Sequence, residues 1–269
     1  MKLSIGWLYP DLMSTYGDRG NIMVLQKRCE WRGIDTTIIP VDFSTTNKQL
    51  QSVDFIFGGG AQDRQQGILI DDLRNNKGQT LKLLIEKGIP GLFVCGSPQL
   101  LGHYYMTGDG KKLEGLGIFD MVSKHFGKDT PRCIGNLIGE IQSSAISSPC
   151  VKAGLHSSDR TTVVGFENHG GRTYLGEGVQ PFATVLYGNG NNGEDKTEGA
   201  VYKNCIATYS HGPFLPKNPH IADWLIQKAL EIKYKSKIEL EELDDTLEWK
   251  AHDYIIKRLG IESFLDAPL

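Results

Sequence analysis

The sequence has no long hydrophobic run, no excess of one charge and no closely paired cysteines. Its apolar stretches, such as residues 89–95, fall well short of the roughly 20 residues that span a membrane as a helix. With 29 Lys and Arg against 32 Asp and Glu, the net charge of −3 gives no electrostatic footprint for non-specific nucleic-acid binding. Residues 1–7 show no apolar core followed by a small-residue cleavage site, so we expect no secretory leader and a cytoplasmic protein.

Cysteine is scarce in this chain of 269 residues. The five cysteines are Cys29, Cys95, Cys133, Cys150 and Cys205. Their odd number, wide spacing and lack of a Cys-x-x-Cys pair argue against both a disulfide framework and a zinc site. We interpret four of them as small buried hydrophobes. Cys95 is the exception, because of the residues that follow it.

Short β-rich runs alternate with amphipathic stretches, which favours an α/β fold over a sandwich or a helix bundle. Strands are predicted at residues 3–8, 34–41, 53–57, 91–95, 161–167, 182–187 and 205–209, and helices at 21–31, 67–87 and 221–234. Residues 75–78 are a candidate break in the second helix, and the Gly/Asn-rich residues 188–199 indicate a surface loop or hairpin tip. We expect one α/β domain over residues 1–235, followed by a helical tail over 236–269 that either packs on the body or binds a partner.

The segment around Cys95 has the pattern of a catalytic elbow. A buried strand ends in Cys95, turns at Gly96 and enters a helix near Pro98, a residue suited to a first helical turn. Backbone N–H groups at the start of that helix stabilise a thiolate, which is the reactive form of cysteine. The alternative is a cysteine that merely packs in the strand, but the Gly-Ser-Pro sequence after it favours a nucleophile.

A thiol nucleophile needs a base, and His211 is the best placed of the seven histidines. It directly follows the predicted strand 205–209 and precedes Gly212 and Pro213, which indicate a loop. Active sites of open α/β sheets lie beyond the carboxyl ends of the strands, where we also expect Cys95. His169, which precedes a pair of glycines, is the second candidate.

Three consecutive glycines, residues 58–60, follow another predicted strand and expose backbone N–H groups. We expect the amides of this loop and of Gly96 to stabilise the oxyanion of an acyl-transfer reaction. A phosphate-binding loop is the competing interpretation. It is weak because the sequence Ala-Gln-Asp-Arg at residues 61–64 contains neither a further glycine nor a Lys-Ser/Thr pair.

Together these residues resemble the class I glutamine amidotransferases. The glycine loop, the elbow FVCGSPQ at 93–99 and the late His211 carry the resemblance, and GFENHGGRT at 165–173 is similar to the cobyric acid synthase-like members. The motifs LYPDL at 8–12, YGDRGN at 16–21 and YSHGPFLPKNP at 209–219 resemble the glutaminase subunits of two-subunit enzymes that amidate the peptidoglycan precursor lipid II. The resemblance runs from residue 8 to about residue 230, and implies a flavodoxin-like open sheet with helices on both faces.

The resemblance also implies roles for individual residues. Cys95 is expected to attack the side-chain amide of L-glutamine, and His211 to protonate the leaving ammonia and then activate water. Gly60 and Gly96 are the implied oxyanion donors. Gln99 would line the glutamine pocket, and Arg132 would bind the substrate α-carboxylate, unless it forms a surface ion pair.

A partner is implied as well. The family passes its ammonia to a Mur ligase-like synthetase subunit of the MurT type, which forms a heterodimer with the glutaminase and amidates the D-glutamate of lipid II to D-isoglutamine. ATP and magnesium are therefore expected on the partner, and no cofactor or metal is expected in this chain. Its own substrate would be L-glutamine, with lipid II met only indirectly.

The chain departs from the common amidotransferase pattern at one position. Many class I enzymes carry a glutamate two residues after the histidine, where this chain has Pro213. The site either operates as a Cys–His dyad or takes an acid from elsewhere, with Glu167, Asp223 and the partner subunit as candidates.

Three other functions are compatible with parts of the pattern. A non-catalytic binding subunit could use the same scaffold, but the intact Cys95 and His211 argue against it. Another cysteine-dependent amidase or peptidase on a flavodoxin-like sheet is the second alternative. A cobyric acid synthase-like amidotransferase is the third, although those enzymes generally carry a synthetase domain for which this chain has no room.

Overall fold

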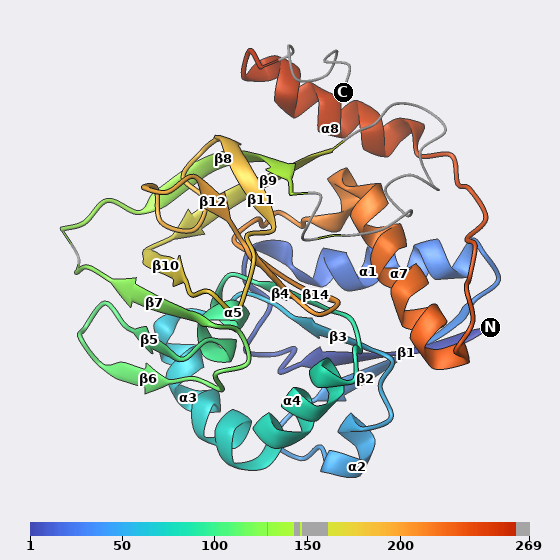
Figure 1. Ribbon diagram of the computed structural model, residues 1–269, viewed down its shortest axis with the longest axis horizontal. Coiled ribbons are helices and arrows are strands. Elements are labelled where there is room, and N and C mark those ends of the chain that lie inside the picture. The colour runs from blue at the N-terminus through green and yellow to red at the C-terminus, as the bar shows by residue number, and fades with distance from the viewer. Residues whose placement is uncertain (128, 143–145, 147–160, 262–269) are drawn as a thin grey trace.

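A six-stranded sheet forms the centre of the computed structural model, which describes residues 1–127, 129–142, 146 and 161–261 (Figure 1). The strand order is β13-β14-β4-β3-β1-β2, from Ala200–Tyr202, Cys205–Thr208, Gly91–Val94, Phe55–Gly58, Lys2–Leu8 and Asp35–Val41. All neighbours pair in parallel except β13, which is an antiparallel edge strand. The order β2-β1-β3-β4-β14 is that of a flavodoxin-like open sheet, so the predicted fold class is confirmed.

Helices cover both faces of this sheet because its strands are apolar on both sides. Phe57 and Leu92 face one core with helices α1 (Arg19–Glu30) and α7 (Pro219–Tyr234). Ile56 and Phe93 face a second core. That core contains helices α3 (Asp63–Asp72) and α4 (Gly78–Glu86), and the single turn α2 (Asn47–Leu50) adds Leu50 to it. A π-helical turn over Leu73–Lys77 separates α3 from α4, close to the break expected at residues 75–78.

Two further four-stranded sheets flank the central one, and the sequence did not predict most of their strands. One has the order β10-β7-β5-β6, from Gly171–Leu175, Met121–His125, Tyr104–Met106 and Lys112–Glu114. The other has the order β12-β11-β8-β9, from Thr197–Glu198, Ala183–Tyr187, Cys133–Ile141 and Thr162–His169. Several of these strands span only two or three residues, too few to show a period-2 pattern.

The C-terminal tail lies against the body through helix α8 (Thr246–Arg258), next to β8 and β9 in Figure 1. Ile256 is buried with Ile138 and Val164. Before the helix, Asp245 forms an ion pair with the buried Arg28 of α1, at 2.6 Å. The predicted helical tail is therefore helical only over residues 246–258, since residues 236–245 form no helix, and the described part packs on the body. Residues 262–269, Cys150 and His156 lie outside the described residues.

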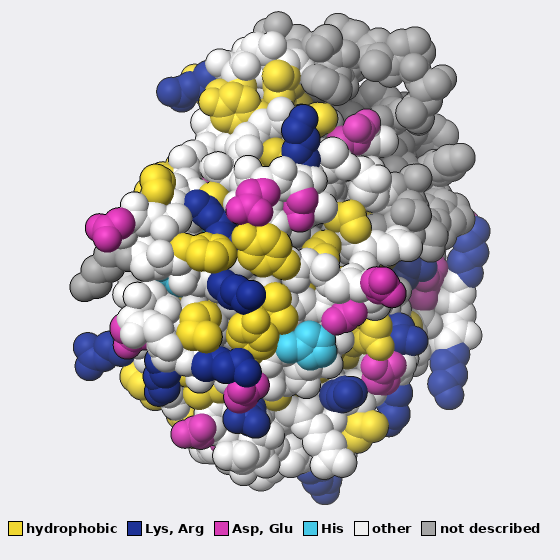
Figure 2. Space-filling model, turned by 60° about the vertical axis from the view of Figure 1, so that its left-hand side comes forward, with side chains coloured by type: hydrophobic (Ala, Val, Ile, Leu, Met, Phe, Trp, Pro, Cys, Tyr) yellow, Lys and Arg dark blue, Asp and Glu magenta, His cyan; other side chains and the backbone are white. Residues whose placement is uncertain are grey.

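Two surface properties agree with the composition. None of the helices in the described ranges is long and apolar enough to cross a membrane. On the face shown in Figure 2, Lys and Arg side chains are interspersed with Asp and Glu rather than gathered into one basic field. Residues 188–196 of the Gly/Asn-rich segment connect β11 to β12 in a hairpin, as predicted, although Thr197–Glu198 form β12 itself and Asn191 and Asn192 are buried.

Candidate active site

Cys95 sits in a strained turn between β4 and helix α5 (Gly96–Leu101). Its backbone angles are φ 52° and ψ −93°, a conformation that residues other than glycine rarely adopt. The Cys95 amide donates to the carbonyl of Thr208 on β14, at 2.8 Å, and this bond holds the turn against the neighbouring strand. The elbow predicted from the sequence is therefore present.

The glycine loop packs directly on this elbow. A Cβ on Gly96 would lie 2.6 Å from the amide nitrogen of Ala61, so only glycine allows the loop to approach this closely. The Ser97 hydroxyl donates to the carbonyl of Gly59 at 2.6 Å, and a Cβ on Gly58 would lie 2.5 Å from the Ser97 oxygen. The small residues on both sides thus bring the loop over the nucleophile.

His211 follows β14, and its ring is completely buried. Its Nδ1 lies 3.2 Å from Oδ1 of Asp18, whose other oxygen accepts the Gly60 amide at 2.6 Å. The ring of Tyr16 covers the imidazole edge-on, with ring centroids 5.1 Å apart. Asp18 is therefore the carboxylate that orients His211. It takes the place of the glutamate that many class I enzymes carry at the position of Pro213.

Asp18 was missed although its motif, residues 16–21, was noticed. Its contact with His211 bridges 193 positions of sequence, so no local spacing indicates it. The signal that could have found it is its place in the loop after β1, because the carboxyl ends of parallel strands meet at one edge of the sheet.

The structure argues against both internal acids that were candidates for this role, Glu167 and Asp223. Glu167 accepts hydrogen bonds from the backbone amides of Asn189 and Gly190, at 2.7 and 2.9 Å. Asp223 forms ion pairs with Arg28 and Arg32 between α1 and α7. Neither carboxylate is a hydrogen-bond partner of His211 among the described residues.

The prediction for Gly60 also needs correction. Its amide donates to Asp18, and a Cβ at this position would lie 2.8 Å from Cε1 of His211. Gly60 therefore supports the His211–Asp18 pair instead of pointing a free donor at the nucleophile. Ala61, the next residue, lines the same cavity as Cys95 and replaces Gly60 as the candidate second donor beside Gly96.

The electrostatics favour a charged imidazole in this site. Burial alone would lower the pKa of His211, but the charge of Cys95 and the hydrogen bond to Asp18 outweigh it and raise the pKa to about 10. An imidazolium beside Cys95 stabilises the thiolate form of the nucleophile. The geometry thus fits a Cys95–His211–Asp18 triad.

Cys95 opens into a cavity of about 400 Å³. Gln99 lines it as predicted, and is held by Gln66, which donates to its Oε1 at 2.8 Å, and by Tyr209, which accepts from its Nε2 at 3.1 Å. Arg132 also lines it, with its guanidinium anchored on the Asn168 carbonyl and side chain at 3.0–3.1 Å. No acidic side chain in the described ranges forms the surface ion pair that was the alternative for Arg132.

The model of the CobB/CobQ-like glutamine amidotransferase domain matches residues 4–219. The chain belongs to this family. Cys95, His211 and Asp18 all lie within the matched residues.

Two relatives of this amidotransferase are similar over nearly their whole length. The lipid II isoglutaminyl synthase (glutamine-hydrolyzing) subunit GatD of Staphylococcus aureus is 38% identical over 96% of both chains. The protein of the same name from Streptococcus pneumoniae is 37% identical, over 91% of this chain and 87% of its own. A probable cobyric acid synthase of Methanothermobacter thermautotrophicus is 28% identical over 74% of this chain but only 40% of its own length.

Solved structures support the fold of the amidotransferase. A crystal structure described as a glutamine amidotransferase covers 84% of this chain and 98% of its own, with a TM-score of 0.53 and 14% identity. The glutaminase domain of Trypanosoma brucei CTPS with bound acivicin covers 89% and 97%, with a TM-score of 0.53 and 14% identity. At such low identity these matches indicate a shared architecture.

His169, the second candidate for the base, has a structural position in the amidotransferase. Its ring is buried and stacked on Tyr209, with centroids 3.8 Å apart, and its Nδ1 lies 2.7 Å from the Gly171 carbonyl. Burial lowers the pKa of His169. His211, in contrast, interacts with both Cys95 and Asp18, so the structure favours His211 as the base.

Cys133, Glu167 and His169 form the one cluster in the described residues whose spacing could suit a metal ion. The guanidinium of Arg172 contacts the Cys133 sulfur, and Glu167 is occupied by the amides of the β11–β12 loop. Since a cation of the protein already faces this cluster, we assign it a structural role.

Proposed function

We propose that this chain hydrolyses L-glutamine and supplies ammonia to a synthetase partner that amidates the D-glutamate of lipid II to D-isoglutamine. The two GatD relatives, similar across almost the entire chain, support this assignment. The observation that carries the hydrolytic part is the strained Cys95 beside the buried His211–Asp18 pair, in a cavity large enough for an amino acid.

In the first half of the proposed reaction, the Cys95 thiolate attacks the side-chain amide carbon of glutamine. The developing oxyanion accepts hydrogen bonds from the amides of Gly96 and Ala61. The carbon–nitrogen bond then breaks, and the His211 imidazolium gives its proton to the departing nitrogen, which leaves as ammonia. A γ-glutamyl thioester remains on Cys95.

In the second half of the proposed reaction, a water molecule takes the place that ammonia has left beside the thioester. Neutral His211 removes a proton from the water, whose oxygen attacks the thioester carbon. The carbon–sulfur bond breaks, L-glutamate departs, and the thiolate–imidazolium pair is restored. Throughout both halves, Asp18 keeps the proton of His211 on Nδ1 and so leaves Nε2 to exchange protons with substrate.

The partner in this proposal is a Mur ligase-like synthetase of the MurT type, which forms a heterodimer with this chain. It would hold ATP and magnesium and activate the D-glutamate carboxyl. The glutaminase would comprise residues 1–235, in line with the family match over residues 4–219. Free ammonia is mostly ammonium near neutral pH and a poor nucleophile, which gives a physical reason for delivery inside a complex.

Cys95→Ala in the purified two-subunit complex tests this function. We expect glutamine-driven amidation of lipid II to disappear and amidation driven by added ammonium salt to persist, because the variant lacks only the source of ammonia. Loss of both activities, at unchanged thermal stability of the complex, would contradict separate sites for the two reactions. Co-purification from cells, with identification of the bound protein, tests the partner.

A cysteine amidase of another specificity is the second candidate, because an elbow and a triad suit many acyl-transfer reactions. A glutamine-mimicking electrophile of the diazo-oxo-norleucine type separates the two. Protection of Cys95 from labelling by L-glutamine, with no protection by L-asparagine, supports the glutaminase. Equal protection by both supports the broader amidase.

A further inference from the structure

The cavity of Cys95 adjoins a larger one. The inner cavity has a volume of about 400 Å³ and the outer one about 760 Å³. Both are lined by Asp63, Arg64, His125 and Arg132. These four charged or titratable residues therefore stand at the passage between the nucleophile and the outer cavity.

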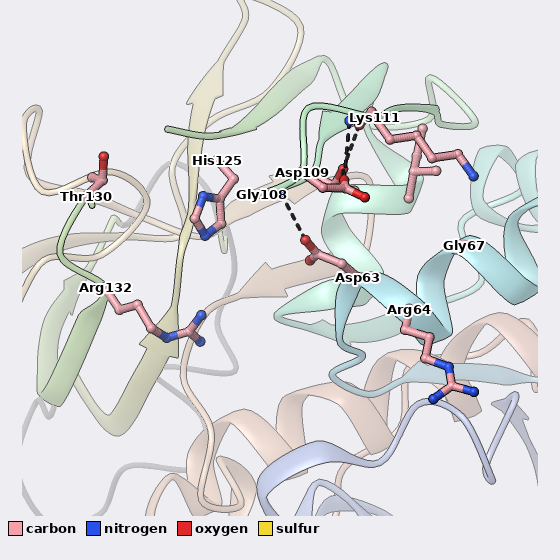
Figure 3. Close-up of a pocket in the computed structure, with 11 residues that line it drawn as sticks. Asp63, Arg64, Gly67, Gly108, Asp109, Lys111, His125, Thr130 and Arg132 are labelled. Carbon is pink, nitrogen blue, oxygen red and sulfur yellow. Dashed lines mark hydrogen bonds between the residues drawn. The ribbon is translucent and has the colours of Figure 1, made fainter. Parts of the chain in front are cut away.

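Asp63 has a distinct place among them. Of the described residues that line the inner cavity, it alone carries a carboxylate. Figure 3 shows the Asp63 carboxylate and the Arg132 guanidinium extending into the same space from opposite walls, with His125 on the side of Arg132. Asp63 thus supplies the carboxylate on its side of the passage, beside the exposed Arg64 on the same helix, and the opposite side carries the hydrogen-bond donors of Arg132 and His125.

The donor wall is well organised. The Nδ1 of His125 accepts the Gly127 amide at 3.0 Å, so in the neutral ring Nε2 carries the proton. A Cβ on Gly170 would lie 2.3 Å from that Nε2 and 3.3 Å from Nη1 of Arg132. Gly170 therefore makes room for both side chains at the same point of the wall.

The carboxylate of Asp63 is equally fixed. Oδ1 of Asp63 accepts the Tyr105 hydroxyl at 2.9 Å, and Oδ2 accepts the Gly108 amide at 3.0 Å. An ionised carboxylate has about four lone-pair sites, so these two bonds hold it in place and leave capacity for a further donor. Asp63 is half-buried, which limits competition from water.

We propose that Asp63 binds the α-ammonium group of L-glutamine, opposite the α-carboxylate on Arg132, and makes the enzyme selective for a free α-amino acid. The inference rests on the proposed glutaminase activity and adds the group that recognises the positive end of the substrate. A zwitterion needs both an anionic and a cationic partner, and the passage offers both. Glutamine analogues without the α-amino group then leave Asp63 without its counter-ion.

Glutaramate, which is glutamine without its α-amino group, is the appropriate probe. Ammonia release from L-glutamine and from glutaramate is measured for the wild-type complex and for Asp63→Asn. A hydrogen bond between charged groups corresponds to about a 10- to 100-fold effect, so the wild type should prefer glutamine by this factor in kcat/KM. In Asp63→Asn we expect KM for glutamine to rise by a similar factor, kcat to change little and glutaramate turnover to stay the same.

Asp109→Asn is the matched control. Asp109 lines the outer cavity only, and its carboxylate is bound to Thr107. We expect this variant to keep the wild-type preference for glutamine. An equal loss of preference in Asp109→Asn and Asp63→Asn would indicate a general charge effect and overturn the proposal.

One further variant and two outcomes in the wild type keep the possible results distinct. Asp63→Glu retains the carboxylate and should recover part of the preference, a rescue that a purely structural role for Asp63 would not require. If the wild type hydrolyses glutaramate as well as glutamine, the inference is wrong whether or not any variant folds. Absence of ammonia release from glutamine by the wild-type complex would instead contradict the proposed function itself.

Discussion

Replacing Asp18 with Asn tests the triad directly. The two oxygens of Asp18 serve two donors, Nδ1 of His211 at 3.2 Å and the Gly60 amide at 2.6 Å. An asparagine has one oxygen and one NH2 group, so it can satisfy only one of them. If the amide oxygen of the asparagine faces His211, its NH2 group lies against the amide of Gly60. If the NH2 group faces His211 instead, the ring adopts the tautomer protonated on Nε2, which cannot accept a proton from the attacking water.

The magnitude follows from the loss of one charge-assisted hydrogen bond in a buried site. Such bonds contribute about 1.5–3 kcal/mol, and each 1.36 kcal/mol changes a rate about tenfold. We therefore expect kcat for glutamine hydrolysis to fall about 10- to 150-fold. KM should change little, since Asp18 does not line the substrate cavity.

The pH profile separates this explanation from a general loss of structure. In the wild type, the charges around His211 raise its pKa to about 10, so the imidazolium persists up to that pH. Without the Asp18 charge, the pKa of His211 falls, and the alkaline limb of kcat/KM should move to lower pH. Ammonia release by the complex, measured from pH 6 to about pH 10.5, records both effects.

Asp11→Asn is the control, because Asp11 is an exposed aspartate in the same segment after β1. It should leave both the rate and the alkaline limb unchanged. If Asp18→Asn keeps wild-type kcat and the wild-type alkaline limb, Asp18 is not the residue that orients His211. The partner subunit then becomes the leading source of the acid.

Two further predictions concern packing. Gly96→Ala places a Cβ 2.6 Å from the Ala61 amide nitrogen, so we expect glutaminase kcat to fall at least about tenfold. Circular dichroism should show that the fold is retained. Gly67→Ala, where a Cβ meets nothing within 4 Å, is the control and should keep full activity. Arg28→Met leaves Asp245 without its cation and Asp223 paired with Arg32 alone. We expect it to reduce the free energy of urea unfolding by about 2–3 kcal/mol, less than for a fully buried pair because both carboxylates keep some exposure; an unchanged unfolding midpoint would contradict this.

The catalytic elbow could be predicted because its determinants are adjacent in sequence. A buried strand, a cysteine, a glycine and a proline near the start of the helix specify the turn at Cys95 locally. His211 followed from the same logic, since both residues come directly after parallel strands. The family resemblance then supplied Gln99 and Arg132, which the structure places on the wall of the cavity.

The remaining parts of the site depend on contacts that no local pattern encodes. Asp18 meets His211 across 193 residues of sequence. The sequence predicted that the Gly60 amide would bind the oxyanion, but in the folded chain this amide donates a hydrogen bond to Asp18. Asp63 was noticed only as an argument against a phosphate loop, because its significance arises when the β5–β6 hairpin and the start of β8 come together around it.

The short strands of the two outer sheets were missed for a related reason. Tyr104–Met106 and Lys112–Glu114 are too brief for a periodic signal, and their stability comes from pairing with each other and, for the first, with Met121–His125. Residues such as Tyr105 and His125, which border the substrate cavity, therefore lay in segments with no predicted structure. Five of the six central strands were predictable because their apolar residues form continuous runs, whereas the three-residue edge strand β13 was missed.

The positive φ of Cys95 influences how this scaffold evolves. A non-glycine residue held in such a conformation costs about 1–3 kcal/mol, which selection tolerates only while the nucleophile is needed. In a lineage whose partner acquires another source of nitrogen, replacement by glycine would relieve the strain and stabilise the domain in one step. Descendants that keep the sheet and the partner contacts but lose hydrolysis are therefore easily reached, and a glycine at this position would be the mark of such a history.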